Sequence, residues 1–332
     1  MYPEAVWIKK TASYFGNLGM TLFFILSGFV ITYNYSSSIL DKGGVKTFLI
    51  ARIARLFPLY LLFIVFISVV NLMFLNIEPS SAYASLVPMN LMAVQSWFYG
   101  EVLGVYWHSS LVYGNVAWSI STEVFLYLVF VPLSLIFFRG DKCGYILSFL
   151  FIAFLILIRV LMINVDLPPS EHFWLNFISP YGRMSEFMIG VFLCHIYWNL
   201  NNSITKRIQL TLCILLFAFG TFLILYYNDT SSTYVSSIFI SMASIIGLSL
   251  LPSSDDLKPL SFQYWLHGLG LISYSVYLIH AILFPVFRYL QMNGLLGFAI
   301  FLLILMCLSY MSYRFIERPA QKFILRSLSS KM

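Results

Sequence analysis

The stretch LLGFAIFLLILMCLSYMSY, Leu295–Tyr313, contains no charged side chain and is long enough as a helix to cross the hydrocarbon core of a bilayer. The stretch LTLCILLFAFGTFLILYY, Leu210–Tyr227, has the same character. Both are continuously apolar, whereas a membrane-spanning β-strand alternates apolar and polar residues over about ten positions. A helix satisfies its own backbone hydrogen bonds in such a segment. The two stretches therefore predict an all-α protein that spans a membrane.

The composition of the whole chain supports the same class. Apolar residues make up 60% of the 332 positions and charged residues 10%, whereas a soluble domain is typically about half apolar and about a quarter charged. The net charge of +6 arises in short connecting segments and near the C-terminus, where basic residues orient a membrane protein and contact anionic headgroups. We therefore expect a lipid bilayer, and no nucleic acid, as a partner.

We predict a polytopic transmembrane helix bundle of nine to ten spans. A tenth candidate, residues 82–98, contains Pro88, Asn90 and Gln95, and we interpret it as an interfacial or re-entrant piece packed against protein. The pair Ser27-Gly28 in the first span predicts a close approach between helices. The nine expected spans are residues 19–36, 56–75, 116–137, 145–164, 178–199, 208–227, 234–251, 269–289 and 295–314.

Basic residues are unevenly distributed between the two sides that nine spans define. With an N-terminus outside, fourteen of the nineteen lysines and arginines fall on one side. The positive-inside rule places that side, and the C-terminus, in the cytoplasm. We therefore expect an extracytoplasmic segment 1–18, an integral membrane domain 19–319 and a basic cytoplasmic tail 320–332.

Arg52 and Arg55 lie three residues apart, so on a helix they share one face at the expected cytoplasmic start of a span. One interpretation is anchoring at the membrane surface. The other is an anion clamp, because guanidinium groups bind phosphates through paired hydrogen bonds and this side of the membrane holds coenzyme A thioesters.

Two further polar positions interrupt the apolar spans. Glu123 follows Trp118 by five residues, and Ser119, Glu123 and Tyr127 recur every four residues as one polar stripe. A carboxyl group at membrane depth costs roughly 3 kcal/mol, which favours a function; a neutral or hydrogen-bonded structural glutamate is the alternative. His280 is a candidate base or a satisfied core histidine.

Arg183 and Glu186 are three apart and opposite in charge, so we expect them to pair; the arginine is also a candidate contact for an anionic acyl donor or sugar. The sequence contains no C-x-x-C pair, P-loop, G-x-G-x-x-G or H-E-x-x-H motif. We therefore expect no metal site and no permanently bound cofactor.

The order of these polar blocks closely resembles that of the acyltransferase-3 family, bacterial multi-span enzymes that acylate cell-surface glycans. As a set, the blocks are specific, although each one alone is a weak signal. The resemblance covers five blocks, namely Gly19–Thr32, Arg52–Tyr60, Trp118–Pro132, Ser273–His280 and Ile316–Pro319.

The resemblance implies a membrane-bound O-acyltransferase, and more narrowly an O-acetyltransferase, in the bacterial cytoplasmic (inner) membrane. Acetyl-CoA or another acyl-CoA would be the co-substrate, and a hydroxyl group of an extracytoplasmic or lipid-linked glycan the acceptor. Arg52 and Arg55 match the family's donor-binding pair, and Glu123 matches its glutamate near the reaction centre. Beside Glu123 we take His280 as a second catalytic candidate. The candidates for support of the polar site are Ser119, Tyr127, Arg183 and Glu186.

The sequence departs from the family pattern at its start. Family members begin with a further span that holds a basic residue and, about eleven positions later, a histidine proposed as the catalytic base. Here no histidine precedes His108, so we expect the first family span to be missing and the chain alone to have low or no transferase activity. Robust acetyl transfer to a glycan by the purified chain would contradict this expectation.

Two other functions fit the residues. A transporter or flippase for lipid-linked saccharides would use the intramembrane charges of Glu123, Arg183 and Glu186 as a polar pathway. The sequence has no paired halves with interrupted helices, which secondary transporters usually show. A non-catalytic partner of a complete acyltransferase is the third possibility.

Overall fold

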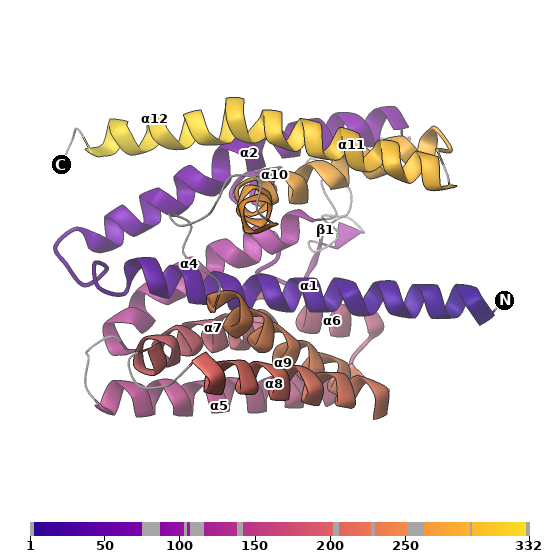
Figure 1. Ribbon diagram of the computed structural model, residues 1–332. Coiled ribbons are helices and arrows are strands. Elements are labelled where there is room, and N and C mark those ends of the chain that lie inside the picture. The colour runs from indigo at the N-terminus through magenta and orange to yellow at the C-terminus, as the bar shows by residue number, and fades with distance from the viewer. Residues whose placement is uncertain are drawn as a thin grey trace. The chain divides into compact units, whose positions relative to one another are not determined.

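The computed structural model describes residues 3–74, 87–102, 105–106, 116–137, 142–201, 206–226, 230–250, 262–292 and 294–329. Long helices make up nearly all of these residues (Figure 1). Two strands of two residues each, β1 (Glu101–Val102) and β2 (Val105–Tyr106), pair antiparallel. The prediction of a polytopic helix bundle is therefore confirmed.

The contacts divide the chain into two compact units, and neither is continuous in sequence. Unit 1 contains Met1–Asp41 and Val131–Pro252, and unit 2 contains Lys42–Phe130 and Ser253–Met332. The helices of unit 1 are α1 (Pro3–Tyr35), α5 (Lys142–Asn164), α6 (Pro169–Phe173), α7 (Pro180–Asn201), α8 (Lys206–Tyr226) and α9 (Thr230–Ser249). Those of unit 2 are α2 (Gly44–Phe74), α10 (Phe262–Tyr289), α11 (Gly294–Ser312) and α12 (Arg318–Ser329), whereas α4 (Ala117–Phe137) begins in unit 2 and ends in unit 1.

Each of the nine predicted spans overlaps one of these helices. Among the described residues, seven helices are long and apolar enough to cross a membrane, so the chain is a multi-pass membrane protein. Helix α9 has a shorter apolar stretch, Thr233–Leu248, and α7 carries the charged pair Arg183 and Glu186. The number of crossings stays a prediction.

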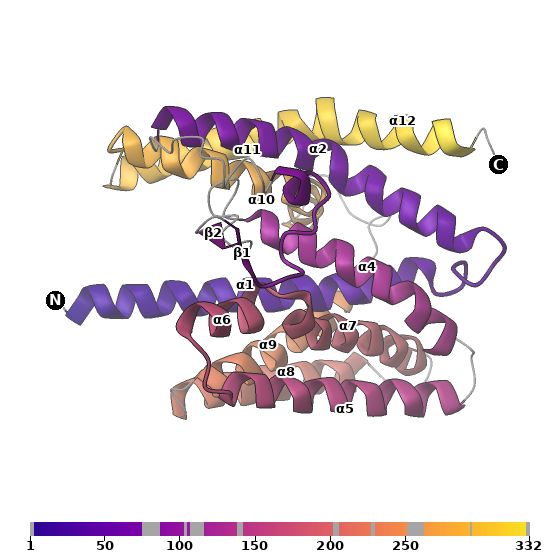
Figure 2. The same ribbon diagram turned by 180° about the vertical axis from the view of Figure 1, so that it is seen from behind.

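Within unit 1, α1 and α7 touch through their backbones at two glycines. A Cβ atom added to Gly28 would lie 2.0 Å from the carbonyl oxygen of Phe187, and one added to Gly190 would lie 1.9 Å from that of Ile25. Small residues allow such approaches in membrane proteins, so the close approach predicted at Ser27-Gly28 is confirmed. Helices α8 and α9 also lie side by side, as Figures 1 and 2 both show.

In unit 2, α2 packs against α10 and α12, and α10 packs against α11. A π-helical turn, Tyr313–Glu317, connects α11 to α12. Helix α2 continues through Pro58 and α10 through Pro285, although proline removes a hydrogen bond from a helix interior.

Residues 87–98 pack against α4, and residues 82–86 of the predicted re-entrant segment lie outside the described part of the chain. The Trp97 indole N–H donates to the Ser121 carbonyl oxygen over 2.9 Å, and the buried Ser96 hydroxyl donates to that of Ser121 over 2.8 Å. Residues 87–91 form one short helix, followed by turns. This described part is a packed connection and no spanning helix.

We expect Gly28→Ala to lower the free energy of unfolding of the protein in detergent by about 1–3 kcal/mol or more, because the new methyl group forces α1 and α7 apart. Gly19→Ala is the matched control on the same helix, since nothing lies within 4 Å of a Cβ at that position. It should be neutral or stabilise by up to about 1 kcal/mol. Thermal unfolding that is equal for both variants would contradict the contact.

We expect Ser96→Ala to destabilise the protein by about 1–3 kcal/mol, because its hydroxyl contacts those of both Ser121 and Thr122 in a buried cluster. The control is Ser273→Ala, which removes an exposed hydroxyl that donates to the Gly270 carbonyl oxygen of its own helix, and it should change stability by less than about 0.5 kcal/mol. A thermal shift of equal size in the two variants would argue against a packed 87–98 segment.

Candidate functional site

Helices α2 and α4 bring Arg52 next to the polar stripe of α4. The Arg52 guanidinium carbon lies 5.9 Å from the ring centroid of Phe48 and 5.9 Å from that of Tyr127. Cation–π contacts at such distances hold a guanidinium group at an aromatic face. Arg52 is half-buried, whereas Arg55 is exposed, so the two arginines of the pair have different surroundings.

Glu123 lies one helical turn before Tyr127, and the Tyr127 hydroxyl donates a hydrogen bond to its Oε1 atom. The spacing of four residues places both side chains on one face of α4. Only 6% of Glu123 is exposed. The predicted stripe thus places the buried carboxyl group, through Tyr127, next to Arg52.

Helix α10 contributes Tyr274 and Ser275 to the same unit. The buried Tyr274 hydroxyl donates to the Leu56 carbonyl oxygen of α2 over 2.8 Å. The Ser275 hydroxyl donates to Oε2 of Glu317 over 3.0 Å. Sequence reasoning missed Glu317 as a site residue, although the block Ile316–Pro319 contains it.

Ser119 and Tyr277 connect α4 to α10. Their hydroxyl oxygens lie 2.6 Å apart, and the Tyr277 hydroxyl also donates to the Val116 carbonyl oxygen over 3.1 Å. The His280 ring lies 5.7 Å from that of Tyr277 and is half-buried. His280 thus lies one helical turn after Tyr277 on α10, beside the residue that contacts Ser119.

These contacts form a series of polar groups on α2, α4 and α10, linked in part through backbone carbonyl oxygens. Gln95 joins it, because its amide donates to the Tyr60 hydroxyl over 3.2 Å and to the Ala117 carbonyl oxygen over 3.1 Å. We call this series the polar column of unit 2; it consists of Arg52, Tyr127, Glu123, Tyr274, Tyr60, Gln95, Ser119, Tyr277 and His280.

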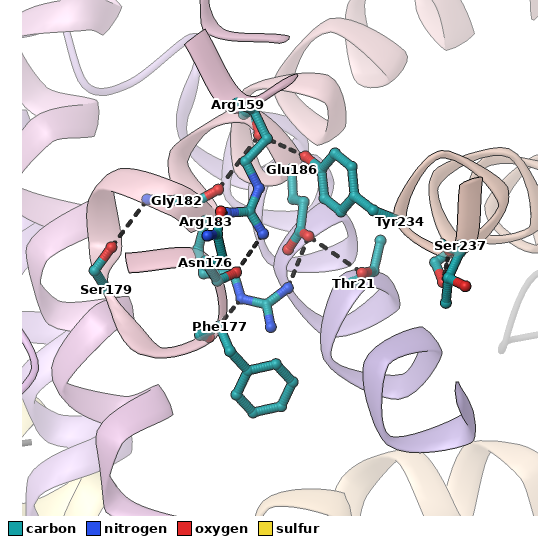
Figure 3. A network of polar contacts seen from close by, with 12 residues as sticks. Thr21, Arg159, Asn176, Phe177, Ser179, Gly182, Arg183, Glu186, Tyr234 and Ser237 are labelled. Carbon is teal, nitrogen blue, oxygen red and sulfur yellow. Dashed lines mark hydrogen bonds and ion pairs between the residues drawn. The ribbon is translucent and has the colours of Figure 1, made fainter. Parts of the chain in front are cut away.

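Arg183 and Glu186 form a second polar cluster, in unit 1. Arg183 Nη1 lies 2.8 Å from Glu186 Oε1, which confirms the predicted pairing. The Thr21 hydroxyl donates to the same carboxylate oxygen over 3.1 Å, and the side chains of Thr21, Arg183 and Glu186 point toward one another in Figure 3. Arg183 and Glu186 thus belong to unit 1, while the other predicted site residues belong to unit 2.

Helix α7 begins at Pro180, within the predicted span 178–199. Ser179 caps it: its hydroxyl oxygen accepts from the Gly182 backbone N–H over 3.2 Å, and Pro180 occupies the first helical position. The cap fixes the first turn of α7, and Arg183 Nε donates to the Phe177 carbonyl oxygen over 2.8 Å. The start of the helix thereby positions Arg183.

Arg159 of α5 belongs to this cluster and was not predicted as a site residue. Its Nη1 donates to Asn176 Oδ1 over 2.7 Å, and its Nη2 donates to the Asn176 carbonyl oxygen. Its guanidinium carbon lies 4.6 Å from the ring centroid of Tyr234. Its position in the apolar span 145–164 could have identified it from the sequence, because an arginine at membrane depth is costly without a function or a partner.

No group of three or more metal-ligating side chains occurs among the residues that the structure describes. What the site offers is cations, a carboxyl group and hydroxyl groups. The cations can bind anionic ligands, and the carboxyl and hydroxyl groups can transfer protons. The apolar helices that carry these groups are those of a membrane protein.

The comparison with protein families assigns the chain to a family. A family model described as an acyltransferase domain, that of the acyltransferase-3 family, matches residues 1–314. The chain therefore belongs to this acyltransferase family, as its sequence blocks predict. Comparisons with curated proteins and with solved structures found no match.

Proposed function

We propose that the chain is an O-acyltransferase, and more narrowly an O-acetyltransferase, that moves an acyl group from a cytoplasmic acyl-CoA to a hydroxyl group of an extracytoplasmic or lipid-linked glycan. The observation that carries this proposal is the meeting of Arg52 and a buried carboxyl group at Tyr127. Family membership supports acyl transfer as the reaction.

Arg52 and Arg55 are the proposed donor-binding residues. Coenzyme A carries several phosphate oxygens, and guanidinium groups bind them through charge-assisted hydrogen bonds. Exposed Arg55 is accessible to a water-soluble donor, while half-buried Arg52 lies against Phe48 and Tyr127. This pair would hold the phosphates so that the thioester extends toward Glu123.

The transfer itself needs a proton acceptor. The acceptor hydroxyl oxygen attacks the thioester carbonyl carbon, the carbon–sulfur bond breaks, and the hydroxyl proton ends on the coenzyme A thiolate. Glu123 is the proposed group that accepts this proton or orients the residue that does, and Tyr127 holds its carboxyl group in position. His280 is the second candidate, because an imidazole near neutral pH accepts a proton readily.

The other members of the polar column have a supporting role in this proposal. Ser119 and Tyr277 connect α4 to α10 next to His280, and Tyr274 connects α10 to α2. Together they keep the three helices in register, so that a donor and an acceptor that enter from opposite membrane faces meet at fixed groups.

We expect Arg52→Ala and Arg55→Ala each to raise the dissociation constant of acetyl-CoA about 10- to 100-fold, because a hydrogen bond to a charged group contributes roughly 1.5–3 kcal/mol. Calorimetric titration of the purified protein measures this. Arg314→Ala, at an exposed arginine of the same unit, is the matched control and should leave the constant unchanged. Unchanged binding in both pair variants would contradict the donor site.

We expect Glu123→Gln to lower whatever rate of acetyl transfer the wild-type chain shows by about 100-fold or more, because proton transfer by a positioned group contributes about 10²–10⁴ in rate, while acetyl-CoA binding stays the same. The assay uses acetyl-labelled acetyl-CoA and membrane vesicles from cells that express the chain. Wild-type rates in Glu123→Gln would remove this residue from the reaction. Movement of saccharide across the vesicles without any thioester would favour the transporter instead.

A further inference from the structure

Unit 1 contains a cavity of about 350 Å³ that the polar column does not use. Residues of α1, α5, α6, α7 and α9 line it together with the segment between α6 and α7. Its volume lies within the range of small-molecule sites, about 300–1,000 Å³. The lining residues on which the inference rests are Thr21, Arg159, Asn176, Phe177, Arg183 and Tyr234.

We propose that this cavity binds a sugar that carries a negative charge, as a carboxylate or a phosphate group, and that Arg159 is the residue that selects for the charge. The negative charge is inferred from the cavity itself. The saccharide rests on the proposed function, which requires a glycan acceptor, and the inference would name the chemical class of that acceptor.

The charge of the cavity wall is the first argument. Arg159 is 4% exposed and Arg183 2% exposed, and the lining residues that the structure describes include both arginines and no carboxylate. Glu186 pairs with Arg183. Arg159 is held by neutral groups, the amide and carbonyl oxygens of Asn176. Among the buried described residues of this cluster, two arginines therefore stand against the one carboxylate of Glu186, and an anionic ligand would balance the excess positive charge.

The fixed position of Arg159 is the second argument. A Cβ atom on residue 182 would lie 2.9 Å from Arg159 Nη1 and 2.4 Å from the Leu175 carbonyl oxygen, so glycine is required there for the guanidinium group to reach Asn176. The Asn176 amide in turn donates to the Met162 carbonyl oxygen over 3.3 Å. A site whose cation is held in place before the ligand arrives loses less conformational entropy on binding.

The remaining lining residues are the third argument, because they are of the kinds that contact sugars. Tyr234, Phe173 and Phe177 offer aromatic faces, and Asn17, Thr233 and Ser237 offer polar groups. The Tyr234 hydroxyl lies 2.8 Å from that of Ser185, so its ring is held in a fixed orientation. Small-molecule sites combine apolar walls with a few placed polar groups in this way.

The test is direct binding to the purified protein in an ethoxylate detergent, which contains no sugar. Calorimetry compares glucuronic acid and glucose 1-phosphate with neutral glucose and with inorganic phosphate. We expect at least one of the two acidic sugars to bind at least tenfold more tightly than glucose and than inorganic phosphate, and the tighter one identifies the anionic group. Equal binding of glucose, equal binding of inorganic phosphate, or no binding of either acidic sugar would overturn the proposal.

Variants connect the binding to this cavity. We expect Arg159→Met to weaken acidic-sugar binding at least tenfold, while the matched control Arg207→Met, at an exposed arginine of unit 1, has no effect. Unchanged binding in Arg159→Met would overturn the proposal. If that variant does not fold, Arg159→Lys replaces it, because lysine keeps the charge but lacks the planar fork, and it should weaken binding less than tenfold but measurably.

The same samples separate this inference from the proposed function. Acetyl-CoA binding depends on Arg52 and Arg55 of unit 2 in the proposal above, so it should be unchanged in Arg159→Met. Retained acetyl-CoA binding with no preference for acidic sugars would overturn the charge-selective cavity and leave the acyltransferase proposal intact. Loss of acetyl-CoA binding in a folded Arg159→Met variant would contradict the independence of the two sites.

Discussion

The hydrogen bond from Tyr127 to Glu123 is the interaction on which the polar column of unit 2 depends. A carboxyl group buried in an apolar helix bundle is costly without a partner, and here the partner lies one turn away on the same helix. The ring of that partner also faces Arg52. One tyrosine therefore connects the cation expected to bind a donor with the carboxyl group expected to handle a proton, and the four-residue spacing on α4 fixes the distance between the tyrosine and this carboxyl group.

The two units solve the problem of buried charge differently. In unit 1, Arg183 has a carboxylate three residues away, and Arg159 is held by amide and carbonyl oxygens. Backbone contact between α1 and α7 at Gly28 and Gly190 brings Thr21 to the same carboxylate. In unit 2 the polar groups are mostly hydroxyls that connect neighbouring helices. The first arrangement suits a fixed charged pocket, and the second suits a path along which protons and acyl groups move.

The sequence allowed the helices to be predicted because each apolar run is long enough to cross a membrane, and the Arg183–Glu186 pair because its spacing is local. The first residues of the helices were harder to predict from the sequence. The first span was expected from residue 19, whereas α1 begins at Pro3, because hydropathy marks the membrane and a helix extends beyond it through polar residues. Contacts between distant segments were not predictable either: Tyr274 meets Leu56 across 218 positions, and Arg159 meets Asn176 only after a chain reversal.

The π-helical turn Tyr313–Glu317 has a consequence for everything that follows it. A π-turn accommodates about one residue more than an α-turn, so it changes the phase of the helix by roughly 100°. Glu317, at the end of this turn, faces Ser275 and is buried. Removal of one residue from the turn would restore the α-helical phase and rotate the carboxylate away from its donor. The number of residues in this turn, as well as their identity, is therefore under structural constraint.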